Sequence, residues 1–277
     1  MKSSAQIAYL GPEGTFSHLV AKKRFGVGSK LFPQASVFDV FDFVRGGKSR
    51  LGIVPIENSS GGTIYETVDC LVDIDSGVSI LEDLSLNVRL ALMGRAGEKI
   101  ETVYSHFVPM RHCEPWLREK LPHAKRVPVS STAKAAEMAA SAKNSAALGT
   151  RDAAKRNGLE ILEFPVHSAV PNITQFYCIG RGSRPLPRSS RTTIVVTLPN
   201  QPGSLCDFLE CFKKTGVNLS RLLSRPIIGQ HKAYLFLADI AGMPEQPKIR
   251  TALSAARKVS ESLRILGVYP VRAMYAS

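Results

Sequence analysis

The sequence predicts an α/β protein: a two-lobed domain followed by a smaller, ferredoxin-like βαββαβ unit. Three observations indicate this fold class. From Gln6 to about Gly180, short apolar strands alternate with amphipathic helices, a rhythm typical of α/β sheets. Two extended apolar runs between residues 78 and 93 interrupt that rhythm, as expected where a chain crosses from one lobe to another. A β-branched strand at 192–198 then opens a second series in the order βαββαβ.

Length and composition describe a globular protein of two domains. The 277 residues are more than one hydrophobic core usually organises, and 44% hydrophobic with 21% charged residues is ordinary for a folded chain. We expect no membrane span, because no run approaches ~18 apolar residues, and no signal core follows the first residues. The five cysteines are odd in number and include no C-x-x-C pair, which favours reduced thiols in a cytoplasmic protein.

The net charge of +13 raises the question of a nucleic-acid partner. Basic residues are scattered along the chain, and the one local cluster, between Arg181 and Arg191, alternates with Gly, Ser and Pro. Such a segment predicts an extended connector and not a helix with a basic stripe. We therefore expect no nucleic-acid and no membrane partner, and a positive field that attracts small anions.

The first domain is predicted element by element from apolar periodicity and caps. Strands are expected at 7–10, 31–32, 51–56, 102–104, 126–129, 146–148, 159–164 and 173–180, the last returning the chain to the first lobe. Helices are expected up to Phe25, over Val37–Arg45, after Thr63, around 113–121, after Thr132 and after Asp152. Thr63 and Glu66 have the spacing of a capping box, which would start the third of these helices.

The second unit is predicted in the same way. A helix opens at Pro202–Ser204, strands follow at 217–223 and 233–240 around a turn containing Gly229, a helix covers 249–263, and a strand covers 264–268.

Four strand-to-helix junctions carry small hydroxylated or glycine-rich turns: Gly11–Ser17, Glu57–Thr63, Ser130–Thr132 and Gly149–Asp152. In a two-lobed fold such junctions can line one cleft from both sides. Helix N-termini and hydroxyls favour negative charge, so the cleft is predicted to bind a small organic anion with more than one carboxylate. The competing interpretation is that these are the ordinary helix caps of any α/β domain.

Five motifs together resemble the prephenate dehydratase family. They are Gly11–Ser17, Pro55–Ser59 with Gly62, Tyr104–His106, Ser131–Thr132 with Ala135–Ala136, and Asn172–Thr174 with Phe176. The resemblance covers nearly the whole chain, because the second unit is similar to the ACT regulatory domain of the bacterial enzyme. It implies a periplasmic-binding-protein-like catalytic domain at 1–182, with one lobe at about 1–77 plus 170–182 and the other at 78–169. A linker at 183–190 and an ACT domain at 191–277 would follow.

The family converts prephenate to phenylpyruvate with loss of water and carbon dioxide, and the resemblance implies this lyase activity in phenylalanine biosynthesis, with no metal or organic cofactor. Thr174 is expected to donate a proton to the leaving hydroxyl. Glu57, Asn58 and Ser59 would shape the site around it. The expected substrate-binding residues are Ser105, His106, Thr15, Thr132, Gln175 and Phe176.

Two departures from the family pattern leave the substrate open. The family usually has arginine where Gln175 follows Thr174, and Pro-Gln-Ala where Phe107-Val108-Pro109 follows His106. An arginine could pair with a carboxylate, whereas glutamine offers only neutral hydrogen bonds. Arogenate as substrate, or a related prephenate decarboxylase, are therefore alternatives.

A third departure lies in the second unit, where Leu223 replaces the acid of the family's Glu-Ser-Arg-Pro motif. The resemblance still implies a homodimer or homotetramer formed through ACT domains, with L-phenylalanine as feedback inhibitor. The expected effector residues are Gly203, Ser204, Leu205, Asn218, Leu219, Ser224, Arg225 and Pro226. A unit that serves only dimerisation is the alternative, and a non-catalytic amino-acid sensor is the alternative for the whole chain.

Overall fold

The computed structural model describes residues 6–26, 28–47, 50–166, 170–182, 188–227, 229 and 233–277. Two compact units are present. The first comprises Met1–Cys70, Leu84–Cys178 and Ala273–Ser277, and the second comprises Leu71–Asp83 and Ile179–Arg272. Neither unit is continuous in sequence. Of the linker predicted at 183–190, residues 183–187 lie outside the described part of the chain.

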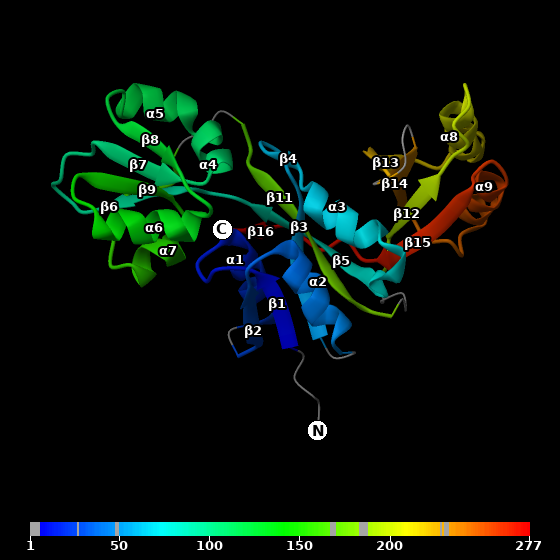
Figure 1. Cartoon of the computed structure of the whole chain (residues 1–277), viewed down its shortest axis with the longest axis horizontal. Helices are drawn as coiled ribbons and strands as arrows, with labels where there is room; N and C mark the ends of the chain where they lie inside the picture. Colours follow the sequence, from blue (N-terminus) through cyan, green and yellow to red (C-terminus); the bar gives the residue numbers. More distant parts are fainter. Residues whose placement is uncertain are drawn as a thin grey trace. The chain divides into compact units, whose positions relative to one another are not determined.

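The larger sheet has the strand order β16-β5-β11-β3-β1-β2, with β4 beside β3 (Figure 1). Its strands are β1 (Gln6–Leu10), β2 (Lys30–Gln34), β3 (Arg50–Asn58), β4 (Gly62–Thr63), β5 (Val78–Asn87), β11 (Ile173–Arg181) and β16 (Tyr275–Ala276). Strand β1 runs parallel to both β2 and β3. The predicted return of the chain to the first lobe is confirmed, since β11 lies between β5 and β3.

Three helices follow strands of this sheet: α1 (Phe16–Phe25), α2 (Val37–Arg45) and α3 (Tyr65–Val72), with a short 3-10 turn, η1 (Ile74–Ser76), after them. Helix α2 has the predicted bounds, because Ser36 and Asp39 form a capping box and its apolar face is buried. The capping box predicted at Thr63 is wrong. Thr63 pairs with Glu57 in β4, and the helix begins two residues later at Tyr65.

The second sheet forms the other lobe of the first unit, with the order β10-β6-β9-β7-β8. Its strands are β6 (Ala91–Gly94), β7 (Thr102–Ser105), β8 (Lys125–Pro128), β9 (Ser145–Gly149) and β10 (Glu160–Glu163). Its helices are α4 (Phe107–His112), α5 (Glu114–Lys120), α6 (Thr132–Ser141) and α7 (Arg151–Arg156). Alanine side chains of α6 and α7 are buried against Met93 and Ala147, so small residues let these helices lie close to the sheet.

The crossing between the lobes differs from the prediction. Residues 78–87 form β5 of the first sheet, so the chain leaves the first lobe at Val88 and not at residue 78. An apolar run signals a strand but does not say which sheet the strand joins, because pairing is set by residues distant in sequence. The outgoing and returning segments are joined by a hydrogen bond from Val88 N–H to the Asn172 carbonyl, 2.7 Å.

The second unit contains the predicted βαββαβ series. Its elements are β12 (Arg191–Thr197), α8 (Ser204–Thr215), β13 (Leu219–Pro226), β14 (Tyr234–Ala241), α9 (Pro247–Lys258) and β15 (Ser262–Tyr269). The antiparallel order β13-β14-β12-β15 is that of a ferredoxin-like sheet. Helix α9 ends at Lys258, not at residue 263 as predicted, because Ser262 already pairs with Thr197.

The sheet of the second unit has no room for a side chain at position 267. A Cβ on Gly267 would meet the carbonyl oxygen of Ile80 and lie 2.9 Å from the Ile80 Cβ. Both Ile80 atoms are held by the backbone of β5, so an alanine forces main-chain movement.

We expect Gly267→Ala to lower the free energy of unfolding by about 2–3 kcal/mol, measured by urea denaturation. Gly28→Ala is the matched control, because its Cβ would meet nothing within 4 Å. Equal stability of the two variants would contradict the close approach of β5 to Gly267.

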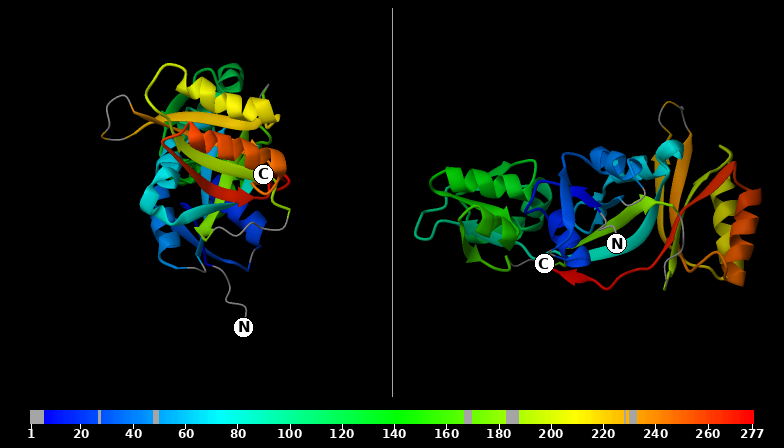
Figure 2. Two further views of the ribbon diagram at one scale, coloured as in Figure 1. Left: turned by 90° about the vertical axis from the view of Figure 1, so that its right-hand side faces the viewer. Right: turned by 90° about the horizontal axis from the view of Figure 1, so that it is seen from below.

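The last residues of the sequence were not predicted as a strand. After β15 the chain runs beside β5: Asp83 N–H donates to the Pro270 carbonyl (3.1 Å), and Arg272 N–H donates to the Asp83 carbonyl (2.9 Å). Strand β16 then pairs in parallel with Leu86 and Asn87 (Figure 2). Residues 273–277 thus belong to the first unit, whereas the prediction assigned them to the second. A two-residue strand carries no periodic signal that sequence reading could detect.

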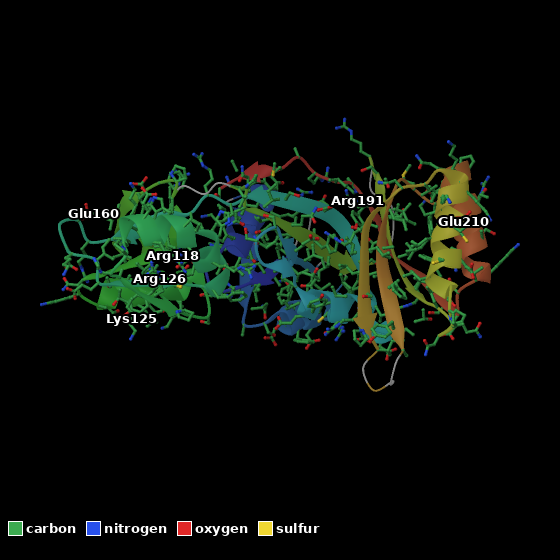
Figure 3. The ribbon with its side chains drawn as sticks, turned by 90° about the horizontal axis from the view of Figure 1, so that it is seen from above. Arg118, Lys125, Arg126, Glu160, Arg191 and Glu210 are labelled. Carbon is green, nitrogen blue, oxygen red and sulfur yellow. The ribbon has the colours of Figure 1, made fainter. Side chains whose placement is uncertain are left out.

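Charged surface residues are partly neutralised by neighbours. On the lobe labelled with Arg118 and Arg126 in Figure 3, both guanidinium groups reach Glu114, at 2.7 and 3.4 Å. Among the residues that the structure describes, no helix has the length and apolar character needed to cross a membrane.

Candidate active site

A cavity of ≈ 360 Å³ lies in the first unit, in the cleft between its two lobes. This volume is in the range of small-molecule sites. Both lobes contribute to it, through the turns after β1, β7 and β8 and through strands β3 and β11. Its polar side chains are those of Thr15, Ser17, Asn58, His106, Ser130, Ser131, Thr132, Asn172 and Thr174. Among the described lining residues none is Asp, Glu, Lys or Arg, so neutral groups give the cavity its polarity.

Two helices begin at the cavity, one from each lobe. Thr15 caps α1 by accepting from His18 N–H (3.3 Å), and Ser131 caps α6 by accepting from Lys134 N–H (3.1 Å). In the described chain, the backbone N–H groups at the first two positions of each helix have no hydrogen-bond partner. They belong to Phe16, Ser17, Thr132 and Ala133. Orphan N–H groups and the helix dipole favour negative charge there, so each helix can hold a carboxylate.

Asn58 organises the polar side of the cavity. Its side chain, at the end of β3 and 9% exposed, makes four hydrogen bonds. Its Oδ1 accepts from the N–H groups of Ser60 (2.9 Å) and Gly61 (2.7 Å). Its Nδ2 donates to Asn172 Oδ1 (2.8 Å) and Thr174 Oγ1 (2.8 Å). Every polar atom of the amide is used, which fixes its orientation.

The Asn58 bond determines what the Thr174 hydroxyl can do. Because Thr174 Oγ1 accepts a hydrogen bond from Asn58, its own O–H is left to donate elsewhere. Thr174 lines the cavity together with Phe176, two residues further along the same face of β11. The geometry therefore supplies, at the wall of the cavity, a hydroxyl whose proton is not used by Asn58.

His106 lies at the start of α4. Its Nδ1 accepts from Val108 N–H (3.4 Å), which places the ring proton of a neutral imidazole on Nε2. Burial lowers the pKa of His106 below its ordinary value, so the side chain is a neutral donor near pH 7.

The cavity brings together six of the ten predicted catalytic and substrate-binding residues: Asn58, Thr174, His106, Thr15, Thr132 and Phe176. Four others lie outside its described lining: Glu57, Ser59, Ser105 and Gln175.

Each of those four has a structural reason for its position. Ser105 is fully buried and its hydroxyl donates to the Leu148 carbonyl (3.0 Å), tying β7 to β9. The Ser59 hydroxyl donates to the Pro171 carbonyl (3.0 Å) and accepts from Ile173 N–H (2.9 Å). Glu57 pairs with Thr63 across β3 and β4. Gln175 alternates with Thr174 and Phe176, and so faces the other side of β11.

The fourth predicted junction, Gly149–Asp152, does not line the cavity but joins the lobes beside it. Thr150 caps α7, and its hydroxyl donates to the Gly14 carbonyl of the other lobe (2.7 Å). A second contact between the lobes joins Ser60 Oγ and His112 Nδ1 (2.8 Å), and the Arg111 guanidinium donates to the Ser60 carbonyl. The cleft is therefore bridged at two places.

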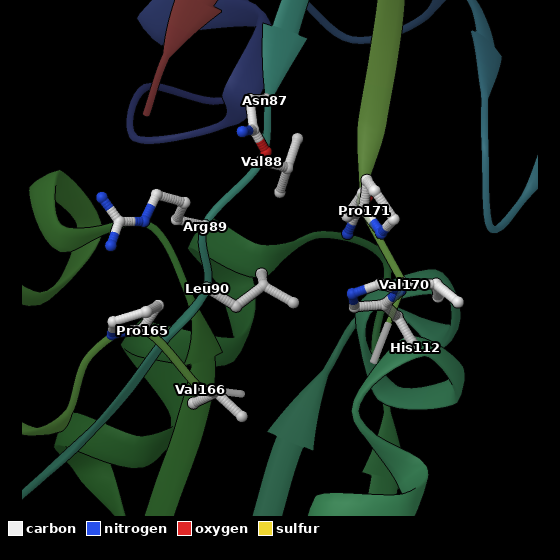
Figure 4. Close-up of a pocket in the computed structure, with 10 residues that line it drawn as sticks. Asn87, Val88, Arg89, Leu90, His112, Pro165, Val166, Val170 and Pro171 are labelled. Atoms are coloured by element: carbon white, nitrogen blue, oxygen red, sulfur yellow. The ribbon is translucent and has the colours of Figure 1, made fainter. Parts of the chain in front are cut away.

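Asn172 belongs to a family motif that the sequence analysis included, but no role at the site was predicted for it. It is 3% exposed, accepts from Asn58, and lines the cavity. The available signal was its place two residues before Thr174, on the same face of the strand. Asn172 also lines a second cavity of ≈ 350 Å³ between the two crossover segments, where His112 lies beside Pro171 and Val170, across from Arg89 (Figure 4).

No group of three or more His, Cys, Asp or Glu side chains within the described residues is arranged to hold a metal ion.

The family model described as prephenate dehydratase matches residues 7–184, more than half of the chain. The chain belongs to the prephenate dehydratase family. A prephenate dehydratase of Mycolicibacterium vanbaalenii is 32% identical over 284 residues, covering 95% of this chain and 90% of the relative.

Solved structures share the fold of this chain. The prephenate dehydratase of Arthrobacter aurescens, crystallised in complex with L-Phe, superposes with a TM-score of 0.87 at 30% identity, covering 96% of this chain and 90% of its own. A structure described as a novel type of quorum-quenching acylase superposes with a TM-score of 0.84 at 31% identity, covering 96% and 97%. The two-lobed fold expected from the sequence is that of prephenate dehydratases.

Proposed function

We propose that this protein is a cytoplasmic prephenate dehydratase that converts prephenate to phenylpyruvate. The net reaction takes up one proton and releases water and carbon dioxide, which makes the ring aromatic. The observation that carries the proposal is the 2.8 Å bond from Asn58 Nδ2 to Thr174 Oγ1, because it leaves the threonine hydroxyl as a donor in a cavity flanked by two helix N-termini.

The residues have separate tasks in the reaction. The bond between the ring carbon and its carboxylate breaks, and carbon dioxide leaves. The released electron pair moves through the ring and expels the hydroxyl from the opposite carbon. Thr174 donates its proton to that departing hydroxide, which leaves as water, and recovers a proton from solvent. A positioned proton donor contributes about 10²–10⁴-fold in rate.

The N-termini of α1 and α6 would hold the two carboxylates of prephenate. Each helix offers two N–H groups that are not used within the described chain, and they come from different lobes. A dicarboxylate bound between the two helices would therefore stabilise the arrangement in which the two lobes contact each other. Neutral donors also suit the step in which one carboxylate loses its charge as carbon dioxide, since no strong ion pair has to be broken.

The substrate is tested by comparing prephenate with arogenate, which carries an ammonium group in place of the keto group. The lining supplies hydroxyl, amide and backbone donors, which match the keto oxygen. We expect kcat/KM for prephenate to exceed that for arogenate by tenfold or more, with product followed as phenylpyruvate or phenylalanine. A preference for arogenate would overturn the assignment of substrate, and no turnover of either would favour a binding protein.

The position of Gln175 leads to a further prediction. Because this side chain faces away from the cavity lined by Thr174, we expect Gln175→Ala to change KM for prephenate by less than about threefold. Phe176→Ala, which removes a cavity wall one residue later, should raise KM at least tenfold in the same steady-state assay. A large KM increase in the Gln175 variant would restore the sequence-based prediction that it binds substrate.

We also propose that the second unit is an ACT domain that binds L-phenylalanine between two copies of the chain. Gly203–Leu205 lie at the start of α8, whereas Asn218 and Leu219 follow its end. The 12 residues of α8 separate these groups by about 18 Å, too far for one amino acid to touch both in a single chain.

The other predicted effector residues lie toward the start of α8. Pro226 pairs with Tyr234, which lines a cavity of ≈ 290 Å³ with Ser204 and Leu205; Ser224 and Arg225 precede it on β13. Two copies related by a twofold axis can bring this end of one unit against Asn218 of the other. The L-Phe complex of the Arthrobacter relative supports an effector of this kind.

Adding L-phenylalanine to the prephenate assay is expected to inhibit turnover, and sedimentation should show a dimer or tetramer. A monomer that binds no phenylalanine would overturn this part of the proposal.

Amide hydrolysis, suggested by the acylase neighbour, fits the geometry less well. Ser60 Oγ and His112 Nδ1 are 2.8 Å apart, the spacing of a nucleophile and its base. However, the N–H groups of Ser60 and Gly61 both donate to Asn58 Oδ1, so neither is available to stabilise an oxyanion. We assign the Ser60–His112 pair to the contact between the lobes.

A further inference from the structure

Asn172 completes the hydrogen bonding of the Asn58 amide. Its Oδ1 accepts one Asn58 N–H at 2.8 Å while the other N–H goes to Thr174 at 2.8 Å. Asn172 is 3% exposed, and its carbonyl anchors Val88 N–H of the opposite crossover segment at 2.7 Å. The Asn172 backbone is therefore tied to the opposite segment, and its side chain is hydrogen-bonded to Asn58, with no ligand needed for either contact.

This arrangement excludes the alternative orientation of the amide. Rotating the Asn58 amide by half a turn would set its Oδ1 against Asn172 Oδ1, and its NH₂ group against the N–H groups of Ser60 and Gly61. In that orientation Thr174 would donate its proton to Asn58 and would have none for a ligand. Ser60 and Gly61 fix one end of the amide, and Asn172 fixes the end nearest Thr174.

We infer that Asn172 is a positioning residue: by accepting one Asn58 N–H it keeps the other on Thr174 Oγ1, so that the threonine proton is directed into the cleft. The inference rests on the proposed dehydratase function, because it assigns the effect to proton donation by Thr174. Asn172 acts through Asn58, so its effect depends on the presence of the Thr174 hydroxyl.

A double-mutant cycle on prephenate turnover tests this dependence. We expect Asn172→Ala to lower kcat at least tenfold in the wild-type background, and less than threefold when Thr174 is already valine. Asn87→Ala, which removes an amide from the last residue of β5 without touching Asn58, should leave kcat unchanged. Equal losses in the two backgrounds, or no loss in the first, would overturn the inference.

Asn172→Asp tests whether the loss of kcat in Asn172→Ala comes only from a damaged structure. Aspartate keeps an oxygen to accept from Asn58, so kcat should stay within threefold of wild type, while its charge raises KM for the dianionic substrate. A fall in kcat as large as that of the alanine variant, at an unchanged melting temperature, would contradict the positioning role. A wild-type protein without turnover would overturn the proposed function and this inference with it; an active wild type with additive losses would overturn this inference alone.

Discussion

Replacing Thr174 with valine is expected to lower kcat for prephenate by about 10²–10⁴-fold and to leave substrate affinity within about tenfold. Valine keeps the shape of threonine but has no proton to donate to the departing hydroxide. In the proposed binding mode the carboxylates are held at the helix N-termini, which this substitution does not change. Steady-state kinetics together with equilibrium binding of prephenate separate the two quantities.

Thr102→Val is the matched control, since it makes the same change on a strand of the other lobe, away from the described lining of the cavity. It should retain wild-type kcat. If the Thr174 variant kept a third or more of wild-type kcat, Thr174 would not be the proton donor.

The second large effect is expected from Asn58→Asp. Aspartate still accepts from the N–H groups of Ser60 and Gly61, so the turn after β3 should keep its shape. The other carboxylate oxygen, however, takes the place of Asn58 Nδ2 and can only accept a hydrogen bond. The Thr174 hydroxyl must therefore donate its proton to the new carboxylate. We expect kcat to fall by about 10²–10³-fold near neutral pH, because the donor is present but points away from the substrate.

The pH dependence of the Asn58→Asp variant gives a sharper readout. When it is protonated, the carboxyl group introduced at position 58 carries an O–H that can donate to Thr174 Oγ1, as the asparagine does. The kcat of the variant should therefore rise as pH falls through the pKa of that carboxyl group, after subtraction of the spontaneous reaction, whereas wild type shows no such rise. A pH profile parallel to that of wild type would contradict the proposed direction of the hydrogen bond.

Local sequence signals predicted most of the fold. Apolar periodicity and caps placed α2 without error and gave the order of the second unit. The errors came from non-local pairing. Strands β5 and β16 both pair within the first sheet. Thr63, which its spacing from Glu66 predicted to be a helix cap, pairs in β4 instead. In each case a partner distant in sequence decides the outcome.

Only some of the site residues could be predicted, again because contacts between residues distant in sequence decide the rest. Caps at Thr15 and Ser131 could be read from the sequence, and the family resemblance supplied Asn58 and Thr174. Whether a hydroxyl faces a ligand depends on which acceptor lies nearest in the fold, and Ser105 finds the Leu148 carbonyl 43 residues away. Asn172 meets Asn58 across 114 residues of sequence, so its role appears only in three dimensions.

The most direct test is a crystal structure of the Thr174→Val protein with prephenate bound. We expect one carboxylate within about 3 Å of N–H groups at the start of α1, the other at the start of α6, and the ring hydroxyl against the side chain at position 174. Prephenate bound outside this cleft, or with its hydroxyl turned away from position 174, would contradict it.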